Sequence, residues 1–263
     1  MTPFHFVAFV FGALVGSFLN VCIGRIPNGE SIVTPGSHCP GCKKPIAFYD
    51  NVPLLSYLFL RGRCRACHEG ISLRYFVVEL LMALFAMALW HWFGLSFSFF
   101  VGFVFVAALI VISFIDLDVR IVPDVISLPG IILGLVFSLL GYFFFRDGSG
   151  VIPSPVSSLI GILTGGVFLL VTAWAYEKVT GVDGMGGGDI KLLAMIGAFL
   201  GWPSIPVTLF IASLLGSVVG IACMAVTGAG RRLALPFAPF LCSGALLYLY
   251  YGNEIIEFYL PPQ

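Results

Sequence analysis

Long apolar runs separated by short polar stretches make up most of the chain. Eight such runs occupy residues 4–23, 75–93, 98–116, 125–145, 156–177, 190–201, 205–227 and 234–251. A helix of about 20 apolar residues spans a hydrocarbon core about 30 Å thick. The pattern therefore predicts an all-α, polytopic membrane protein with about eight transmembrane helices.

The sixth run is too short to cross the membrane as a regular helix. Residues 190–201 give about 18 Å of helix at 1.5 Å per residue. We expect either a short span in locally thinned membrane or a half-helix buried among its neighbours. The first run, 4–23, has no basic stretch before it, so it is predicted to be a retained span and not a cleaved signal peptide.

The composition narrows the class of protein further. Hydrophobic residues make up 59% and charged residues 10% of the 263 positions, whereas soluble domains carry about 25% charged residues. A mean hydropathy of +1.06 excludes a water-soluble globular protein, so membrane lipid is an expected partner. The formal net charge is zero, so the chain lacks the basic field typical of nucleic-acid-binding proteins, and no nucleic-acid partner is expected.

Basic residues set the expected orientation, because cytoplasmic loops are enriched in Lys and Arg. Seven of the 13 Lys and Arg residues lie in 25–74, the one long polar stretch. If this stretch is cytoplasmic, alternation of the eight spans leaves only Arg146 outside. Both termini are then periplasmic, and Asp116 and Asp189 both lie at the cytoplasmic face.

Two Cys-x-x-Cys pairs lie within this polar stretch, Cys39 with Cys42 and Cys64 with Cys67. This spacing is typical of tetrahedral four-cysteine zinc sites, in which the thiolates leave no open position for catalysis. A cytoplasmic location argues against structural disulfides, and a redox-active pair is the alternative. Since about 50 residues are too few to build a core alone, we expect either a metal or docking against lipid to stabilise the insert, and the cysteines favour a structural Zn²⁺.

Two aspartate motifs stand at the cytoplasmic ends of predicted spans. One holds Asp116, Asp118 and Asp124, and the other reads Gly184-Met-Gly-Gly-Gly-Asp189-Ile-Lys191. Asp116 and Asp189 share one depth and one membrane side, so two separate helices can bring them together. Apposed carboxyl groups cannot both ionise cheaply, and such a pair can activate water against a peptide carbonyl. The glycines before Asp189 allow backbone to approach a substrate closely.

A structural role is the alternative for each of these acids. Asp124 follows Pro123 and suits the N-cap of the fourth helix, and Asp189 suits the N-cap of the sixth. We favour such a role for Asp118 and Asp124, and a catalytic role for Asp116 and Asp189.

A further group of residues lies where the first two spans meet the polar stretch. Gly16 suits close helix packing, while Asn20 and Arg25 can face a polar site. Glu79, just inside the second span, requires a partner, for which Arg74 and Arg25 are the candidates.

Together these residues resemble the type IV prepilin peptidases, the leader peptidase/N-methyltransferases of pilus and type II secretion systems. The similarity covers nearly the whole chain. It is strongest in the motif that ends in Asp189-Ile-Lys191, in the segment from Asp116 to Asp124, and in Gly16-Ser-Phe-Leu-Asn-Val21. The four cysteines are similar to the cytoplasmic region of the bifunctional members.

The resemblance implies an aspartic endopeptidase of the bacterial inner membrane. Its activity would be to remove the basic leader of prepilins and pseudopilins, and then to methylate the new N-terminus from S-adenosylmethionine. Asp116, eight residues before Asp124, and Asp189 would be catalytic. The supporting motif residues would be Asp118, Asp124, Gly186, Gly188 and Lys191, and the candidate cofactor residues Gly16, Asn20, Arg25 and Glu79.

The same resemblance implies a division of the chain into three parts. Residues 1–24 would form the first span, 25–74 the cytoplasmic zinc-binding loop, and 75–263 the transmembrane aspartic peptidase domain. Methyl transfer would involve 1–80. Two other classes compete with an enzyme: a transporter that binds protons or cations at Asp116 and Asp189, and a zinc-binding membrane scaffold without catalysis.

Overall fold

The computed structural model describes residues 3–39, 41–145, 151–181, 186–227 and 235–259. Within these ranges the chain is helical, without β-strands, and two isolated bridges pair His38 with Pro45 and Arg63 with Gly70. The helices form two compact units, Met1–Leu95 and Ser96–Gln263. The all-α prediction is confirmed.

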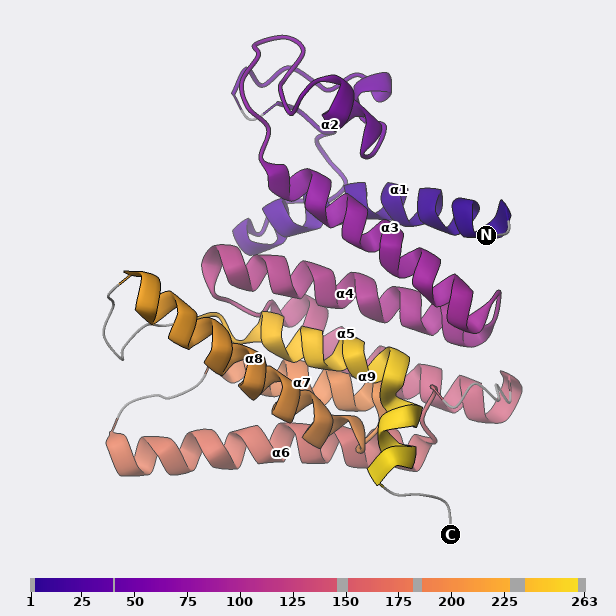
Figure 1. The fold of residues 1–263 in the computed structure, drawn as a ribbon, viewed down its shortest axis with the longest axis vertical. Coiled ribbons are helices and arrows are strands. Elements are labelled where there is room, and N and C mark those ends of the chain that lie inside the picture. Colours follow the sequence, from indigo (N-terminus) through magenta and orange to yellow (C-terminus); the bar gives the residue numbers. More distant parts are fainter. Residues whose placement is uncertain (1–2, 40, 146–150, 182–185, 228–234, 260–263) are drawn as a thin grey trace. The chain divides into compact units, whose positions relative to one another are not determined.

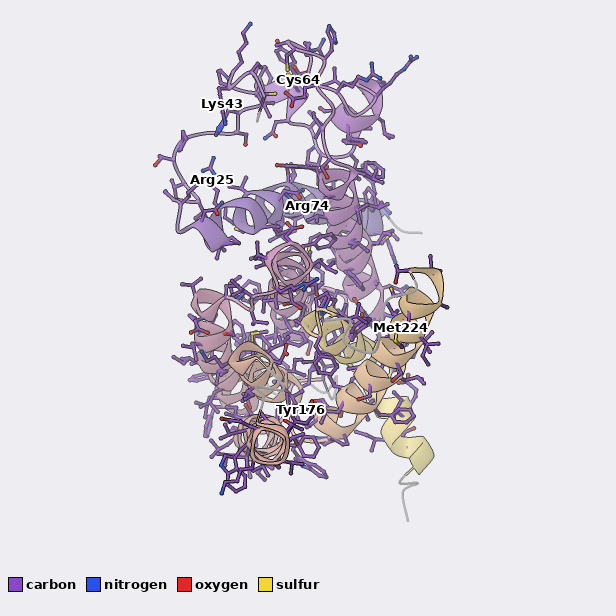
Figure 2. The ribbon with its side chains drawn as sticks, turned by 90° about the vertical axis from the view of Figure 1, so that its left-hand side faces the viewer. Arg25, Lys43, Cys64, Arg74, Tyr176 and Met224 are labelled. Carbon is purple, nitrogen blue, oxygen red and sulfur yellow. The ribbon has the colours of Figure 1, made fainter. Side chains whose placement is uncertain are left out.

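The N-terminal unit consists of two long helices and an insert between them. Helices α1 (Pro3–Arg25) and α3 (Leu73–Phe93) pack antiparallel along their length (Figure 1). They approach closely at Gly16, where an added Cβ would lie 2.7 Å from the Cα of Glu79. The insert holds three short elements, η1 (Ile26–Asn28), η2 (Phe48–Asp50) and α2 (Leu55–Phe59). In Figure 2, Lys43 and Cys64 lie above Arg25 and Arg74, on the side of the insert that faces away from the two helices.

The C-terminal unit is a bundle arranged around a short helix. Its elements are α4 (Phe97–Val119), α5 (Asp124–Leu140) with a π-helical end η3 (Gly141–Phe145), α6 (Pro155–Thr180), α7 (Gly187–Leu200), α8 (Ser204–Thr227) and α9 (Ala238–Tyr259). Helix α7 packs against α5 and α6 and also contacts α8 and α9 (Figure 1). Every residue from Leu192 to Leu200 is buried. The short sixth run is therefore a helix enclosed by its neighbours, one of the two alternatives expected.

The chain is a multi-pass membrane protein, but the count of eight spans is not confirmed. Six helical stretches are long and apolar enough to cross a membrane: Pro3–Asn28, Leu73–Phe93, Phe97–Val119, Asp124–Phe145, Pro155–Thr180 and Ser204–Thr227. Helix α7 is excluded because its 14 residues span only about 21 Å. Helix α9, which covers most of the eighth predicted run, is not among the six either.

Several sequence predictions concern residues that the structure does not describe. Gly184 and Met185 of the Gly-rich motif lie outside the described residues, as do Arg146, Arg231 and Arg232, on which part of the orientation depends. The orientation of the spans, with periplasmic termini, stays a prediction.

Candidate functional site

Asp116 lies in the last turn of α4 and is buried, with 5% of its surface exposed. Its Oδ2 accepts a hydrogen bond of 3.1 Å from the backbone N–H of Ala238, the first residue of α9. The helix ends just after it, because Arg120 adopts a left-handed conformation and donates its N–H to the carbonyl of Asp116. Asp118, two residues further along the helix, is exposed.

Asp189 is the third residue of α7, a helix outside the six candidate spans. Burial, together with the negative charge of Asp116, raises the pKa of Asp189 to about 6. Both carboxyl groups also interact electrostatically with the thiol of Cys242 in α9, which is hydrogen-bonded to Ser113 of α4. The structure thus brings the two sequence-predicted aspartates together from α4 and α7, next to the start of α9.

The start of α7 is held against the segment that joins α4 to α5. An added Cβ at Gly188 would lie 2.7 Å from the Cβ of Val122, so only glycine fits there. Lys191 Nζ lies 2.7 and 2.8 Å from the two carboxylate oxygens of Asp124. Both contacts fix the position of the helix turn that carries Asp189.

The capping roles considered for the acids are wrong. The N-cap of α5 is Pro123, and Asp124 is the first residue of that helix. Gly186 is the N-cap of α7 and accepts the backbone N–H of Asp189 at 3.2 Å, without any side-chain cap bond. Since neither carboxylate serves as a cap, both are available for other contacts.

The neighbouring carboxyl groups of Asp116 and Asp189 can act together in acid–base catalysis. Two neighbouring carboxyl groups with restricted access to water share a proton more readily than they ionise together. A pair that holds one proton offers a base and an acid at one place, which is what attack of water on a carbonyl requires.

The four cysteines of the insert form a second constellation. Their sulfur atoms all lie within 4.8 Å of one another, and the Sγ atoms of Cys39 and Cys67 are 3.7 Å apart. A tetrahedral zinc with Zn–S bonds of about 2.3 Å places its sulfurs about 3.8 Å apart. The thiols therefore fit a metal ion held by four cysteine ligands.

The backbone around the two cysteine pairs repeats itself. The N–H of Cys39 donates to the carbonyl of Lys44, and that of Lys43 returns to Cys39. In the second half, the N–H of Cys64 donates to Glu69, and that of His68 returns to Cys64. Lys43 and His68 both have positive φ, at 57° and 58°. Two equivalent turns thus present their thiols to one point, as expected of paired metal knuckles.

One thiol of the cluster is already poised to ionise. Hydrogen bonds from the backbone N–H groups of Cys67 and Ala66 lower the pKa of Cys64 to about 7. A metal ligand must be a thiolate, so this geometry favours the metal-binding form of the side chain.

The four candidate cofactor residues take up different contacts. Asn20 Nδ2 donates to the carbonyl of Tyr75 at 3.0 Å, and Gly16 packs against Glu79. Oε2 of Glu79 accepts the backbone N–H of Leu54 at 2.7 Å, a partner that the sequence did not indicate. Arg25 donates to the carbonyls of Ser31 and Pro35 and lines a cavity beside α1.

Comparison with known families accounts for both halves of the chain. Residues 10–93 match the bacterial peptidase A24 N-terminal domain, and residues 103–221 match the type IV leader peptidase family. The chain belongs to the type IV leader peptidase family. The four cysteines fall in the first match, and Asp116 and Asp189 fall in the second.

Full-length relatives in the type IV leader peptidase family carry one shared name. Proteins from Aeromonas hydrophila and Pseudomonas putida are each 36% identical to the chain over 97% of its length. The matched regions cover 93% of the first protein and 94% of the second. A protein from Pseudomonas aeruginosa is 34% identical over 97% of the chain and 95% of its own length. All three are named prepilin leader peptidase/N-methyltransferase. No solved structure matches the chain.

The sequence of this leader peptidase family member did not identify some of the residues that contact the two aspartate motifs. Ala238 contributes only its backbone N–H, and it lies beyond the residues that match the family. Val122 is one of many buried aliphatic residues, and its role depends on contact with Gly188. Pro239 next to Ala238 could have marked a helix start, since proline is favoured in the first turn.

Proposed function

We propose that the chain is a prepilin leader peptidase/N-methyltransferase. In this proposal it cleaves the basic leader from type IV prepilins and type II secretion pseudopilins at the cytoplasmic face of the bacterial inner membrane. It then methylates the new N-terminal residue with S-adenosylmethionine. Family membership and the name of the relatives support both activities. The observation that carries the peptidase is the pair of neighbouring carboxyl groups of Asp116, which is buried, and Asp189, which is half-buried.

The surroundings of the two carboxyl groups suggest different roles. Asp116 accepts an N–H bond at the positive end of α9, which offsets part of the cost of burying its ionised form. Asp189 accepts no such bond within the described part of the chain, and its raised pKa favours its protonated form. Asp116 would remove a proton from water as the water attacks the scissile carbonyl carbon. Asp189 would donate its proton to the carbonyl oxygen, and the pair would then return a proton to the leaving nitrogen.

The substrate fits a site at a membrane boundary. A prepilin has a basic leader followed by an apolar helix, so the bond to be cut lies where water and lipid meet. Asp116 stands at the end of a candidate span and Asp189 near the start of α7, next to that end. Gly186 and Gly187 leave open space beside Asp189, into which an extended peptide can come close.

The metal of the insert is proposed to be Zn²⁺, held by Cys39, Cys42, Cys64 and Cys67. With four thiolate ligands, zinc would supply folding free energy and no catalysis. Its role would be to hold the two equivalent turns of the insert together.

The methyltransferase part is proposed to lie within 1–80. Gly16, Asn20, Arg25 and Glu79 remain candidates for contact with S-adenosylmethionine; Arg25 lines a cavity, while Asn20 and Glu79 bond to backbone groups of Tyr75 and Leu54. We derive no step of methyl transfer from them. The three-part division at 1–24, 25–74 and 75–263 also stays a proposal.

The peptidase is tested with purified protein and a substrate that carries a basic leader before an apolar helix. Asp116→Asn and Asp189→Asn should each abolish cleavage without loss of thermal stability, while the exposed control Glu177→Gln retains it. If either of the first two variants cleaves at the unmodified rate, that residue has no catalytic role. Transfer of labelled methyl from S-adenosylmethionine to the cleaved product tests the second activity separately.

A further inference from the structure

An apolar segment of the insert has a surface that is unusual for a loop in water. Residues 52–60 read Val-Pro-Leu-Leu-Ser-Tyr-Leu-Phe-Leu, with the hydroxyls of Ser56 and Tyr57 as the only polar side-chain groups. They include α2, and the side chains of Leu55, Leu58 and Phe59 are exposed, Phe59 to 83%. Single exposed apolar residues are common, but a contiguous set marks a surface that contacts something other than water.

The depth of this segment identifies what it contacts. Leu54 is buried against Ala13 of α1 and Ala83 of α3. Ala83 lies ten residues after the start of α3 at Leu73, about 15 Å along the helix. Ala13 lies twelve residues before the end of α1, about 18 Å from it. The middle of a hydrocarbon core is about 15 Å from either face. Because α1 and α3 are candidate spans, Leu54 lies at the depth of lipid chains.

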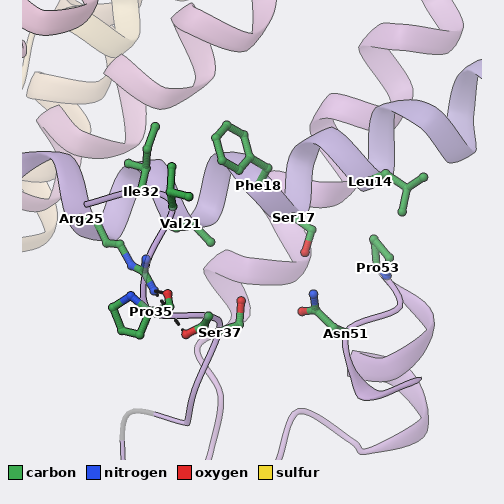
Figure 3. Close-up of a pocket in the computed structure, with 12 residues that line it drawn as sticks. Leu14, Ser17, Phe18, Val21, Arg25, Ile32, Pro35, Ser37, Asn51 and Pro53 are labelled. Carbon is green, nitrogen blue, oxygen red and sulfur yellow. Dashed lines mark hydrogen bonds between the residues drawn. The ribbon is translucent and has the colours of Figure 1, made fainter. Parts of the chain in front are cut away.

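A cavity beside α1 shows the same placement independently. Figure 3 shows Pro35 and Ser37 near Arg25, at the end of α1, and Asn51 and Pro53 near Ser17 and Leu14. Leu14 is eleven residues from Arg25, about 16 Å along the helix. Between Ser37 and Pro53 the insert therefore runs back along α1, from its end toward its middle, where residues 52–60 begin. The cavity that these two parts of the insert form with α1 has a volume of about 280 Å³.

Most backbone N–H groups of the segment have partners within the protein, as residence in lipid requires where no water satisfies polar groups. The N–H groups of Ser56, Leu58 and Leu60 donate to carbonyls of the same segment. The N–H of Val52 donates to Ser56 Oγ, and that of Leu54 to Glu79. The bond from Leu54 also gives the buried carboxyl group of Glu79 a hydrogen-bond partner within the span formed by α3.

Polar and charged residues bound the segment on both sides. Asp50 precedes it and Arg65 follows it, and Arg65 forms two hydrogen bonds to Asp50 Oδ1, of 3.0 and 2.7 Å, which join the two flanks. Arg61 and Arg63 are exposed directly after it. Basic side chains in this position extend to the headgroups of anionic lipid.

We propose that residues 52–60 are a re-entrant element that enters the membrane leaflet on the side of the insert. Leu55, Leu58 and Phe59 contact lipid acyl chains, and Arg61 and Arg63 lie at the headgroups. The insert is thus anchored in lipid beside α1 and α3, with its cysteine site outside the hydrocarbon. The proposal depends on α1 and α3 as spans and not on either enzyme activity.

The test uses full-length protein in vesicles of phosphatidylethanolamine and phosphatidylglycerol. The photo-crosslinker p-benzoyl-L-phenylalanine replaces Phe59 in one variant and the exposed residue Lys43, beside the cysteine site, in a matched control. After irradiation, mass spectrometry should find several-fold more acyl-chain adduct at position 59 than at position 43. Equal yields at the two positions, or a protein adduct at position 59 in place of lipid, would overturn the proposal.

A second measurement covers the case in which the crosslinker disturbs the insert. Phe59→Trp adds one fluorophore, and the emission of the unmodified protein is subtracted. Lipid brominated on its acyl chains should quench the added emission, and aqueous acrylamide should quench it weakly. Strong quenching by acrylamide without quenching by brominated lipid would place Phe59 in water and refute the proposal.

Discussion

The backbone N–H of Ala238 donates a hydrogen bond of 3.1 Å to Oδ2 of Asp116. This bond connects the end of α4 to the first residue of α9, 122 positions later in the chain. Hydrogen bonds to a carboxylate stabilise its charged form, and so does the positive end of a helix. The contact therefore offsets part of the cost of burying the charged form of Asp116, and supports the role of base that we propose for it.

The first prediction removes this donor while keeping the helix. Proline lacks an N–H but is tolerated in the first turn of a helix, where that N–H has no partner within the helix. Ala238→Pro should therefore keep α9 folded, lower the thermal unfolding temperature by no more than the loss of one hydrogen bond accounts for, and reduce the rate of prepilin cleavage. Loss of a hydrogen bond to a charged group is worth about 1.5–3 kcal/mol, or roughly 10-fold to 150-fold in rate.

Ala238→Gly is the matched control, because it retains the N–H and changes only the side chain. It should cleave at nearly the unmodified rate. If the proline variant is folded and also cleaves at that rate, the Ala238 bond does not contribute to catalysis.

The sequence predicted the two aspartates but could not predict what holds them. Asp116 and Asp189 are recognisable because an acid at the end of an apolar run is rare and expensive. Ala238 acts through a backbone group that every residue except proline possesses, so its residue type carries no information. Val122 is similarly indistinct, since its significance appears only when Gly188 is packed against it.

The spans were predicted better than the insert for a related reason. The length of an apolar run can be read directly from the sequence, and six of the eight runs correspond to helices of spanning length. The contact of Leu54 with Glu79 joins residues 25 positions apart in the sequence, so no local pattern reveals it. Glu79 was expected to pair with an arginine, because the sequence shows charges but not the backbone that reaches them.

A second prediction concerns the stability of the protein as a function of pH. Asp189 would ionise near its ordinary value of about 3.9 when unfolded, whereas its pKa is raised to about 6 when folded. The folded state thus holds a proton that the unfolded state has lost, and stability falls as pH rises from about 4 to 6. The full loss corresponds to about 3 kcal/mol. Asp189→Asn, which cannot ionise, should unfold at a higher temperature than the unmodified protein at pH 8.

The same difference should disappear well below pH 4, where Asp189 is protonated in both states. An Asp189→Asn variant that is no more stable than the unmodified protein at pH 8 would show that Asp189 ionises without strain.

A third prediction separates packing from substrate contact in the Gly-rich motif. A methyl group at position 188 would clash with Val122, whereas one at position 187 meets no atom within 4 Å. Gly188→Ala should therefore lower stability by about 1–3 kcal/mol, the usual range for overpacking. Gly187→Ala should leave the unfolding temperature unchanged. Val122→Gly should restore part of the stability of Gly188→Ala, and additive effects of the two substitutions would exclude the contact.

The metal site gives a fourth prediction that does not depend on activity. Purified protein should contain one Zn²⁺ per chain by mass spectrometry, and Cys39→Ser or Cys64→Ser should lose it. Residues 25–74 should then be cut rapidly by added protease, because the binding free energy of zinc is also folding free energy. Cys223→Ser, in α8 and apart from the cluster, should retain the metal. A fully reduced protein without bound metal would refute the assignment.

The last prediction concerns the ion pair between Lys191 and Asp124. The side chains are 37% and 56% exposed, and ion pairs in such positions contribute only about 0–1 kcal/mol to stability. Lys191→Met should therefore change the unfolding temperature little. It should nevertheless reduce kcat, because the pair fixes the turn of α7 in which Asp189 lies, two residues away. Exchange of the charges in Asp124→Lys with Lys191→Asp keeps the pair but moves the cation to α5. Recovery of kcat in the exchanged protein would support positioning, whereas failure to recover would mean that the ammonium group at position 191 itself contacts the substrate.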